Sequence, residues 1–261
     1  MYRRFITGLL AVILLIPPLP ALAATEDIIS HDTALRSTYA PAYDLQHDGS
    51  FSHSYDLELP PGRDGLTPDL SLTYNSNRTS IHSILGKGWE FSIPYIKRTN
   101  KSGSEDLYTS DFFSSSLDGE LVNQGAGVYH PRTENGDFRS YEFASDAWIV
   151  TDKAGTRWVF GSTTQARQNN PATTSEIYKW MLEDVIDTND NEINYTYHKH
   201  EGQIYPEQIA YVDDTITVSF DRASRTDSIQ SYEPAFRVET ADLIDEVTVA
   251  NDGVTDHTFE I

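Results

Sequence analysis

The chain has 261 residues, contains no cysteine, and carries a formal net charge of −21. The absence of cysteine excludes disulfides, a thiol nucleophile and cysteine-ligated zinc. The negative charge argues against binding to nucleic acid or to anionic membranes, both of which attract basic surfaces. It indicates a well-solvated surface, with calcium or a basic partner protein as the alternative reason for so many acids. Hydrophobic residues make up 38% of the chain, which is enough to form a core.

The N-terminus has the organisation of a secretory signal peptide, which we assign to residues 1–24. Two arginines precede an apolar run over 9–16, and prolines then lead to an A-x-A cleavage site within 21–24. The apolar run is about half of the roughly 20 residues that a membrane-spanning helix needs. We therefore expect Sec-dependent export, a secreted or periplasmic location, and no membrane insertion once the signal is removed.

Residues 25–50 show no periodicity and are expected to form an irregular leading segment. From residue 51 to 261, apolar and polar residues alternate, which is typical of strands with one face on a core. We therefore predict one all-β domain of many short antiparallel strands over 51–261. The alternating apolar sets are Leu70, Leu72 and Tyr74; Trp89, Phe91, Ile93 and Tyr95; Ile193, Tyr195 and Tyr197; Ile216, Val218 and Phe220; and Val247 with Val249.

Turn sequences separate these strands. Asp118-Gly119 is a strong two-residue hairpin signal, and Asn135-Gly136 precedes a further strand. Residues 152–155 and 187–191 separate two more pairs of strands. Both of these turns begin with aspartate and lead into a strand, so the two units echo each other and indicate hairpins stacked into an extended sheet. The pattern predicts a meander, a sandwich or a shell.

The segment 177–186 fits two structures. A helix would collect Ile177, Trp180, Met181 and Val185 on one face. A strand would collect on one face Tyr178, Trp180, Leu182 and Ile186. We predict a strand in a long hairpin, because a dense turn and another strand follow.

The last residues, 257–261, read as a strand. An edge strand with unpaired backbone groups invites pairing with another strand. We therefore expect this strand to pair with a C-terminal continuation or with a second chain.

Two stretches are distinctive: residues 59–77 (LPPGRDGLTPDLSLTYNSN) and 85–98 (LGKGWEFSIPYIKR). Together they resemble the N-terminal domain shared by the Salmonella plasmid virulence protein SpvB and the B components (TcaC/TcdB type) of insecticidal toxin complexes. The segment 178–191 is similar to an RHS-like repeat unit, and the resemblance extends over about 45–255. It implies an all-β part of a hollow shell, with toxin-complex subunits or a C-terminal continuation as partners. It also implies that toxic activity belongs to other regions or subunits.

The residues of these motifs also have structural explanations. Pro60-Pro61 favours an extended backbone, and glycines such as Gly62, Gly86 and Gly88 permit tight reversals or close approach of a neighbour. In the RHS-like unit, Asn189-Asp190-Asn191 replaces the family's Asn-Gly-Asn, which implies a looser turn.

The sequence shows no nucleotide-binding glycine loop, no nucleophile elbow and no His-Glu-x-x-His motif. The family's ADP-ribosyltransferases need a Glu-x-Glu pair, and none occurs in this sequence. Asp187, Asn189 and Asn191 match the first ligand positions of an EF-hand loop. Glu192 then stands where glycine is needed, and His198 where a bidentate glutamate is needed. An Asx-rich turn is therefore predicted instead of a calcium site.

His198 and His200 would share a strand face, but no third metal ligand accompanies them. We expect no catalytic residue, cofactor or metal, and predict a non-enzymatic structural or scaffold domain of a secreted toxin or virulence protein. The alternative is a secreted module that binds carbohydrate or a protein surface through exposed aromatic residues. The tryptophans favour core packing instead, because they lie in alternating apolar faces: Trp89, Trp148, Trp158 and Trp180.

Overall fold

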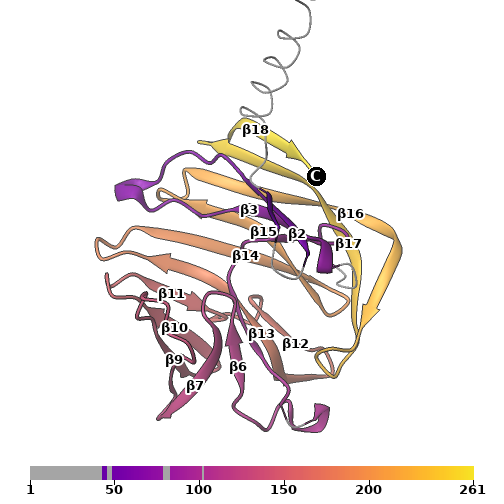
Figure 1. The fold of residues 1–261 in the computed structure, drawn as a ribbon. Coiled ribbons are helices and arrows are strands. Elements are labelled where there is room, and N and C mark those ends of the chain that lie inside the picture. The colour runs from indigo at the N-terminus through magenta and orange to yellow at the C-terminus, as the bar shows by residue number, and fades with distance from the viewer. Residues whose placement is uncertain (1–42, 46–48, 79–82, 102) are drawn as a thin grey trace, which may run out of the picture. The chain divides into compact units, whose positions relative to one another are not determined.

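The computed structural model describes residues 43–45, 49–78, 83–101 and 103–261. The predicted signal peptide and most of the predicted irregular segment lie outside the described residues. The chain divides into two compact units, 1–43 and 44–261, and the fold described here is that of the second (Figure 1). Among the described residues, no helix has the length and apolarity required to span a bilayer.

The strands form a four-stranded sheet and a fourteen-stranded antiparallel sheet, which confirms the predicted all-β fold. The small sheet contains β1 (Tyr43–Leu45), β2 (Phe51–Asp56), β3 (Ser71–Asn75) and β4 (Trp89–Phe91). The large sheet contains β5 (Tyr95–Arg98), β6 (Phe113–Ser115), β7 (Gly119–Gly125), β8 (Val128–Pro131), β9 (Ser140–Ala144), β10 (Ala147–Thr151), β11 (Arg157–Phe160), β12 (Arg167–Asn170), β13 (Thr173–Ile186), β14 (Glu192–His200), β15 (Gln203–Tyr211), β16 (Ile216–Ser231), β17 (Val238–Asn251) and β18 (Val254–Glu260). Short 3₁₀ turns are η1 (Arg63–Gly65), η2 (Ser76–Arg78) and η3 (Ser104–Asp106).

Eight strands of the large sheet close into a barrel (Figure 1). They run in the order β11-β10-β9-β8-β7-β6-β5-β13, and β11 then pairs with β13 to complete the ring. Trp158 stands opposite Val185 in this closing pair. A sheet that closes on itself has no unpaired edge within the ring. The sequence left open a meander, a sandwich or a shell, and this part of the chain is a meander that closes.

The barrel is filled by aromatic rings. Their centroids lie between 4.7 and 6.2 Å apart, mostly in edge-to-face or tilted geometry, which favours aromatic attraction. Trp148 and Trp180 are both 0% exposed, and the half-buried Trp89 and Trp158 pack against the same core, so the predicted core packing of the tryptophans is confirmed. The rings of this cluster are Phe113, Tyr129, Phe143, Trp148 and Trp180.

Charged side chains cover both ends of the barrel. At one end the Arg98 guanidinium lies 5.0 Å from the centre of the Phe113 ring and donates hydrogen bonds to the carbonyls of Ile177 and Ser110. At the other end the Asp118 carboxylate, from the predicted hairpin turn, accepts hydrogen bonds from Arg139 and from the Tyr141 hydroxyl. The interior is therefore a packed core and not a channel.

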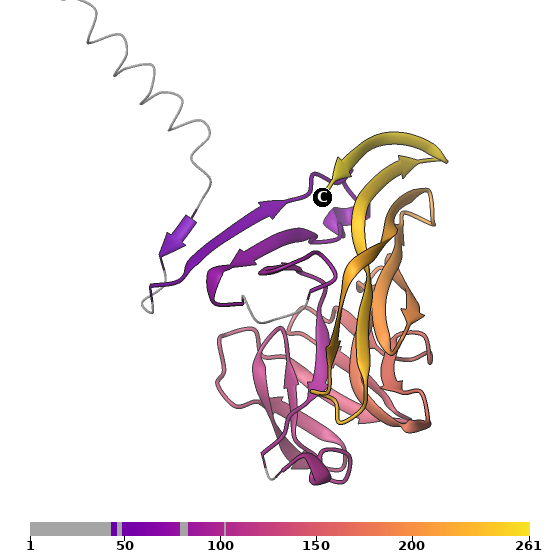
Figure 2. The ribbon, with the colours of Figure 1, turned by 90° about the vertical axis from the view of Figure 1, so that its right-hand side faces the viewer.

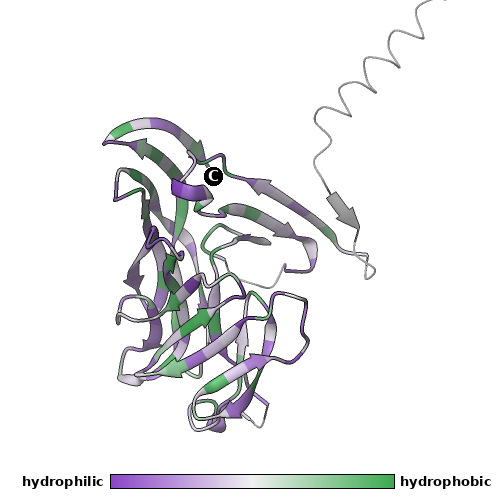
Figure 3. Cartoon of the chain, turned by 90° about the vertical axis from the view of Figure 1, so that its left-hand side faces the viewer, coloured by the Kyte–Doolittle hydropathy of each residue, from purple (hydrophilic) through white to green (hydrophobic). Residues whose placement is uncertain are grey.

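Strands β14 to β18 extend the sheet beyond the barrel, and the small sheet packs against them (Figure 2). The Phe91 and Phe220 rings, one from each sheet, meet edge to face at 5.2 Å. Apolar and polar segments alternate along these long strands (Figure 3), as the sequence predicted for Val247 and Val249, both of which are 0% exposed.

The alternation from Trp89 to Tyr95 predicted a single strand, but the structure divides this run in two. It contributes β4 to the small sheet and β5 to the barrel, with a break between them. Pro94 lacks a backbone donor, which ends pairing. The Ser92 hydroxyl fixes the break, because it accepts from the Ser71 amide and donates to the Asp69 carbonyl. A single alternating run thus connects the two sheets.

Residues 177–186 lie within strand β13, which confirms the strand prediction. The predicted face was wrong in its first and last members. Ile177 lies in the main core while Tyr178 packs in a separate small cluster, and Val185 is buried in the core in place of Ile186. A β-bulge explains the change at Val185: Phe160 pairs with Leu182, but Val159 pairs with Asp184. The extra residue shifts the alternation by one position. That residue, Glu183, turns its carboxylate to the backbone N–H of Thr163 and the hydroxyl of Ser162.

Asp184, next to the bulge, gives a pH prediction. Burial, followed by the charges of Glu192 and Glu183, raises the pKa of Asp184 to about 6. Because the folded-state pKa lies above the unfolded value, its contribution to stability is complete below about pH 4 and is lost as the pH rises through about 6. Asp184→Asn should therefore raise the thermal midpoint at pH 7.5, and the difference from the wild type should shrink at pH 4.5. An equal difference at both pH values would contradict this assignment.

The two echoing turns have the same hydrogen bonds. In the first, Asp152 Oδ1 accepts from the amides of Ala154 and Thr156. In the second, Asp187 Oδ1 accepts from the amides of Asn189 and Asn191. Both are therefore Asx turns, which confirms the Asx turn predicted for residues 187–191. The expected loosening is not seen, because Asp190 adopts φ 60° where the first turn has a glycine, and aspartate tolerates this conformation.

Candidate functional site

The first distinctive motif forms a loop that is fastened onto distant turns. The Pro60 carbonyl accepts a hydrogen bond from the Tyr211 hydroxyl at 2.7 Å. Arg63 forms an ion pair with Asp213 at 2.6 Å. Asp64 accepts from the side-chain amide of Asn191, in the second Asx turn. The loop therefore holds the small sheet to the β13–β14 and β15–β16 hairpins, which is a structural task.

The second motif brings two backbones together. Gly88 has φ 86°, and a Cβ atom there would lie 2.6 Å from the Tyr74 ring. The prediction of a close approach is therefore confirmed at Gly88. At Gly86 nothing lies within 4 Å of such an atom, so glycine is required there only for the backbone φ of 96°.

A bend in the longest hairpin builds a pocket beside the barrel. Ser224 pairs with Asp242, but Ile229 already pairs with Thr240, so extra residues of β16 bulge out between them. Beyond this bend the tip of the hairpin reaches the barrel, where the Tyr108 hydroxyl donates to the Pro234 carbonyl and Phe236 packs in a small cluster with Leu107. The hairpin thus becomes a wall beside the barrel end.

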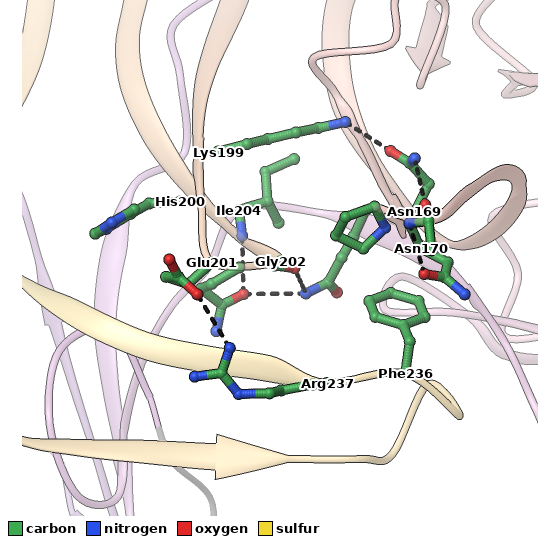
Figure 4. A pocket seen from close by; sticks show the side chains of 13 residues that line it. Asn169, Asn170, Lys199, His200, Glu201, Gly202, Ile204, Phe236 and Arg237 are labelled. Atoms are coloured by element: carbon green, nitrogen blue, oxygen red, sulfur yellow. Dashed lines mark hydrogen bonds and ion pairs between the residues drawn. The ribbon is translucent and has the colours of Figure 1, made fainter.

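The pocket under this wall has a volume of about 580 Å³, and we call it the hairpin pocket (Figure 4). Its walls come from the end of β12, the β14–β15 turn and the tip of the β16–β17 hairpin. The residues that define it are Gln168, Asn169, Lys199, Gly202, Phe236 and Arg237.

A network of fixed hydrogen bonds holds the pocket open. The Gln168 amide donates to the Gly202 carbonyl at 3.0 Å and to Gln203 Oε1 at 3.2 Å. Arg237 pairs with Glu201 at 3.1 Å, across the pocket from Lys199 and Asn169 (Figure 4). The backbones also meet closely, because a Cβ atom on Gly202 would lie 2.8 Å from the Arg237 carbonyl oxygen. The lining is therefore arranged before any ligand enters.

A second pocket, of about 300 Å³, lies where β4 and β5 face β13 and β15. The Lys179 amine lies 4.5 Å from the centre of the Tyr95 ring. Burial, followed by the charge of Lys97, lowers the pKa of Lys179 to about 8. Lys97 itself pairs with Glu233 at 3.0 Å. This pocket therefore uses its charges mainly to tie the hairpin tip to the barrel.

The candidate metal ligands of the sequence are used for other contacts. His200 pairs with Asp242 at 2.7 Å, and its ring points away from the hairpin pocket (Figure 4). The His198 and His200 rings lie 6.5 Å apart. Asp187 is occupied by its own turn, and the Asn191 amide holds the pKa of this carboxyl below its usual value. Within the part of the chain that the structure describes, no group of three His, Asp or Glu side chains could hold a metal ion.

No motif in the sequence points to the hairpin pocket. Its residues come from three separated segments, 168–172, 199–204 and 236–237, and none of these forms a known motif. The one available sign was the concentration of side-chain amides at 168–170, which an unpaired loop would also have. The bend in β16 that brings the segments together has no sequence signal that we can identify.

Comparison with known protein families assigns the chain. Residues 45–142 and 128–232 match the family described as Salmonella virulence plasmid 65kDa B protein, SpvB. The chain belongs to the SpvB family. The resemblance carried by the two motifs is therefore confirmed, and the match covers most of the barrel and of the extended sheet.

SpvB relatives match over a limited part of their own length. The mono(ADP-ribosyl)transferases SpvB of Salmonella choleraesuis and Salmonella typhimurium are 25% identical over 185 residues, which is 59% of this chain. The matched region is 31% of each relative, so the chain spans less than a third of their length.

Solved structures show the same fold in SpvB and in Tc toxins. The N-terminal domain of the effector SpvB from Salmonella typhimurium LT2 matches with a TM-score of 0.65 and 19% identity, covering 75% of this chain and 86% of that domain. TcdB2-TccC3-TEV matches with a TM-score of 0.69 and 19% identity, covering 81% of this chain and 13% of that one. The Photorhabdus luminescens Tc holotoxin pore gives 0.66 and 20%, covering 81% and 13%.

Proposed function

We propose that this SpvB-family chain is a non-enzymatic scaffold module of a secreted bacterial toxin or virulence protein, and that it contributes strands to a β shell. A packed barrel that continues into a long open sheet carries the proposal, because such a module can add strands to a larger wall without a catalytic cavity of its own. The Tc-toxin neighbours, in which the same fold is 13% of a much longer chain, support this role. Toxin-complex subunits or a C-terminal continuation are the proposed partners.

The edge where such a wall would grow is strand β18. Within the described residues it pairs with β17 alone. Ile261 donates its amide to Asp245 of β17, so in antiparallel alternation Phe259 also faces β17 and the amides of Glu260 and Thr258 point outward. Thr258 is exposed. These outward N–H groups can donate hydrogen bonds to a further strand.

Thr258→Pro tests this edge. Proline at an outward position removes a donor to the next strand but not the pairing with β17. At high concentration we expect the wild-type chain to associate through β18, and the variant to associate at least about threefold less, as measured by light scattering. Thr258→Ala, which keeps the outward N–H, is the matched control and should behave as the wild type. Equal association of all three proteins would count against edge pairing.

The same samples should not consume NAD⁺, and consumption would contradict the non-enzymatic role.

A further inference from the structure

Gln168 presents an unused acceptor in the hairpin pocket. Its side chain is 5% exposed, and its two amide hydrogens are both engaged, with the Gly202 carbonyl and with Gln203 Oε1. Among the residues that the structure describes, nothing donates a hydrogen bond to Gln168 Oε1. The oxygen is not one of the fully buried unpaired atoms, so it is open to the pocket. It can therefore accept a hydrogen bond from a hydroxyl or amide of a ligand.

Lys199 presents an unpaired cation on the same pocket. Its amine donates to Asn169 Oδ1 at 2.8 Å, and no carboxylate of the described chain forms an ion pair with it. The pocket's other cation, Arg237, is paired with Glu201. Burial, followed by the charge of Arg167, lowers the pKa of Lys199, and an anion beside it would reverse that shift.

The remaining lining is suited to a ring. Phe236, Pro171 and Ile204 supply apolar surface between the polar groups. A volume of about 580 Å³ accommodates one or two sugar units. Side-chain amides can bind hydroxyls, a lysine can bind a carboxylate, and an apolar wall can contact the face of a ring. Together these groups suit a ring that bears both hydroxyls and a carboxylate.

We propose that the hairpin pocket binds an acidic sugar of the hexuronate type, with its carboxylate on Lys199, a hydroxyl donating to Gln168 Oε1, and its ring against Phe236. The interaction does not depend on the scaffold role, because the pocket lies at the β14–β15 turn and away from the β18 edge. It also differs from the aromatic platform that the sequence offered as an alternative, since Trp148 and Trp180 are buried in the barrel.

Titration of the whole chain with D-glucuronate, D-glucose and acetate tests the proposal, with the side-chain amide signals of glutamine and asparagine followed by NMR. Glucuronate should shift the Gln168 amide signals with a dissociation constant of about 1 mM, typical of a small polar ligand. Glucose lacks the carboxylate and acetate lacks the ring, so each should bind at least about tenfold more weakly. Equal binding of acetate or of glucose would overturn the proposal, as would the absence of any shift with glucuronate.

Variants of Lys199 locate the binding. Lys199→Gln should weaken glucuronate binding by about ten- to a hundredfold, because a charge-assisted hydrogen bond is lost. Lys199→Arg keeps the charge and should retain affinity to within about fivefold. Lys87→Gln makes the same change of charge at an exposed lysine and is the matched control. If Lys199→Gln and Lys87→Gln weaken binding equally, the carboxylate does not contact Lys199, and the proposal fails.

Discussion

Replacing Gly62 by alanine should destabilise the domain by about 3 kcal/mol, through steric overlap alone. A Cβ atom at Gly62 would lie 2.7 Å from the carbonyl carbon of Leu66 and would overlap its oxygen. The backbone φ of −82° is one that alanine adopts freely, so the cost is not torsional. The obstacle is backbone and not a flexible side chain, so the loop has to open.

Opening would release the contacts that fasten the loop. The Gly62 amide donates to Thr67 Oγ1 at 2.8 Å, and the Leu66 amide donates to the Arg63 carbonyl at 2.8 Å. Arg63, whose side chain is already 53% exposed, would then leave Asp213, and the loosened backbone around it could enter the trypsin active site. We therefore expect faster cleavage after Arg63 in Gly62→Ala, together with a lower free energy of unfolding in urea.

Gly253→Ala is the matched control for Gly62→Ala. Gly253 has φ 74° with nothing within 4 Å of an added Cβ, so alanine there meets torsional strain without a clash. We expect a cost of about 1 kcal/mol and no new cleavage after Arg63. If the two variants lose the same stability and neither is cleaved faster, the rigidity of this loop is not what the motif provides.

The sequence predicted the class of fold because the information is local. Alternation at Val247 and Val249 and the Asx residues of the 187–191 turn act on their immediate neighbours, and both appear as expected. Closure of the barrel depends on β11 meeting β13, a contact between strands that the chain separates by β12. No local pattern specifies that pairing. The bulge at Glu183 was missed for a related reason. It is defined by how β11 pairs with β13, and the residues of β13 alone carry no sign of it.

The candidate site was less accessible to sequence reasoning than the fold. His198 and His200 attracted attention because of their type and spacing, yet Asp242, more than 40 residues away in the chain, pairs with His200. Gln168 and Lys199 attracted none, because an amide and a lysine are ordinary surface residues until a bent hairpin encloses them. Such sites depend on which acceptors and cations remain unpaired, and pairing is a property of the folded chain.

Phe113→Ala should cost about 4 kcal/mol, since it removes the ring at the centre of the barrel cluster. Phe113 is 1% exposed and contacts four other rings, with the nearest centroid, that of Trp148, at 4.9 Å. Arg98 would lose the ring that its guanidinium faces at 5.0 Å, so one covered end of the barrel would weaken as well. Urea unfolding followed by tryptophan fluorescence would measure the loss, because Trp148 and Trp180 report on the same core.

Two further variants make the result of Phe113→Ala decisive. Phe113→Leu keeps most of the volume and should cost about 1.5 kcal/mol, so a graded loss can be measured even where the alanine variant fails to fold. Phe138→Ala removes a ring that is 64% exposed and should change stability by less than about 0.5 kcal/mol. A Phe113→Ala cost as small as that of Phe138→Ala would mean that the barrel is not a packed core.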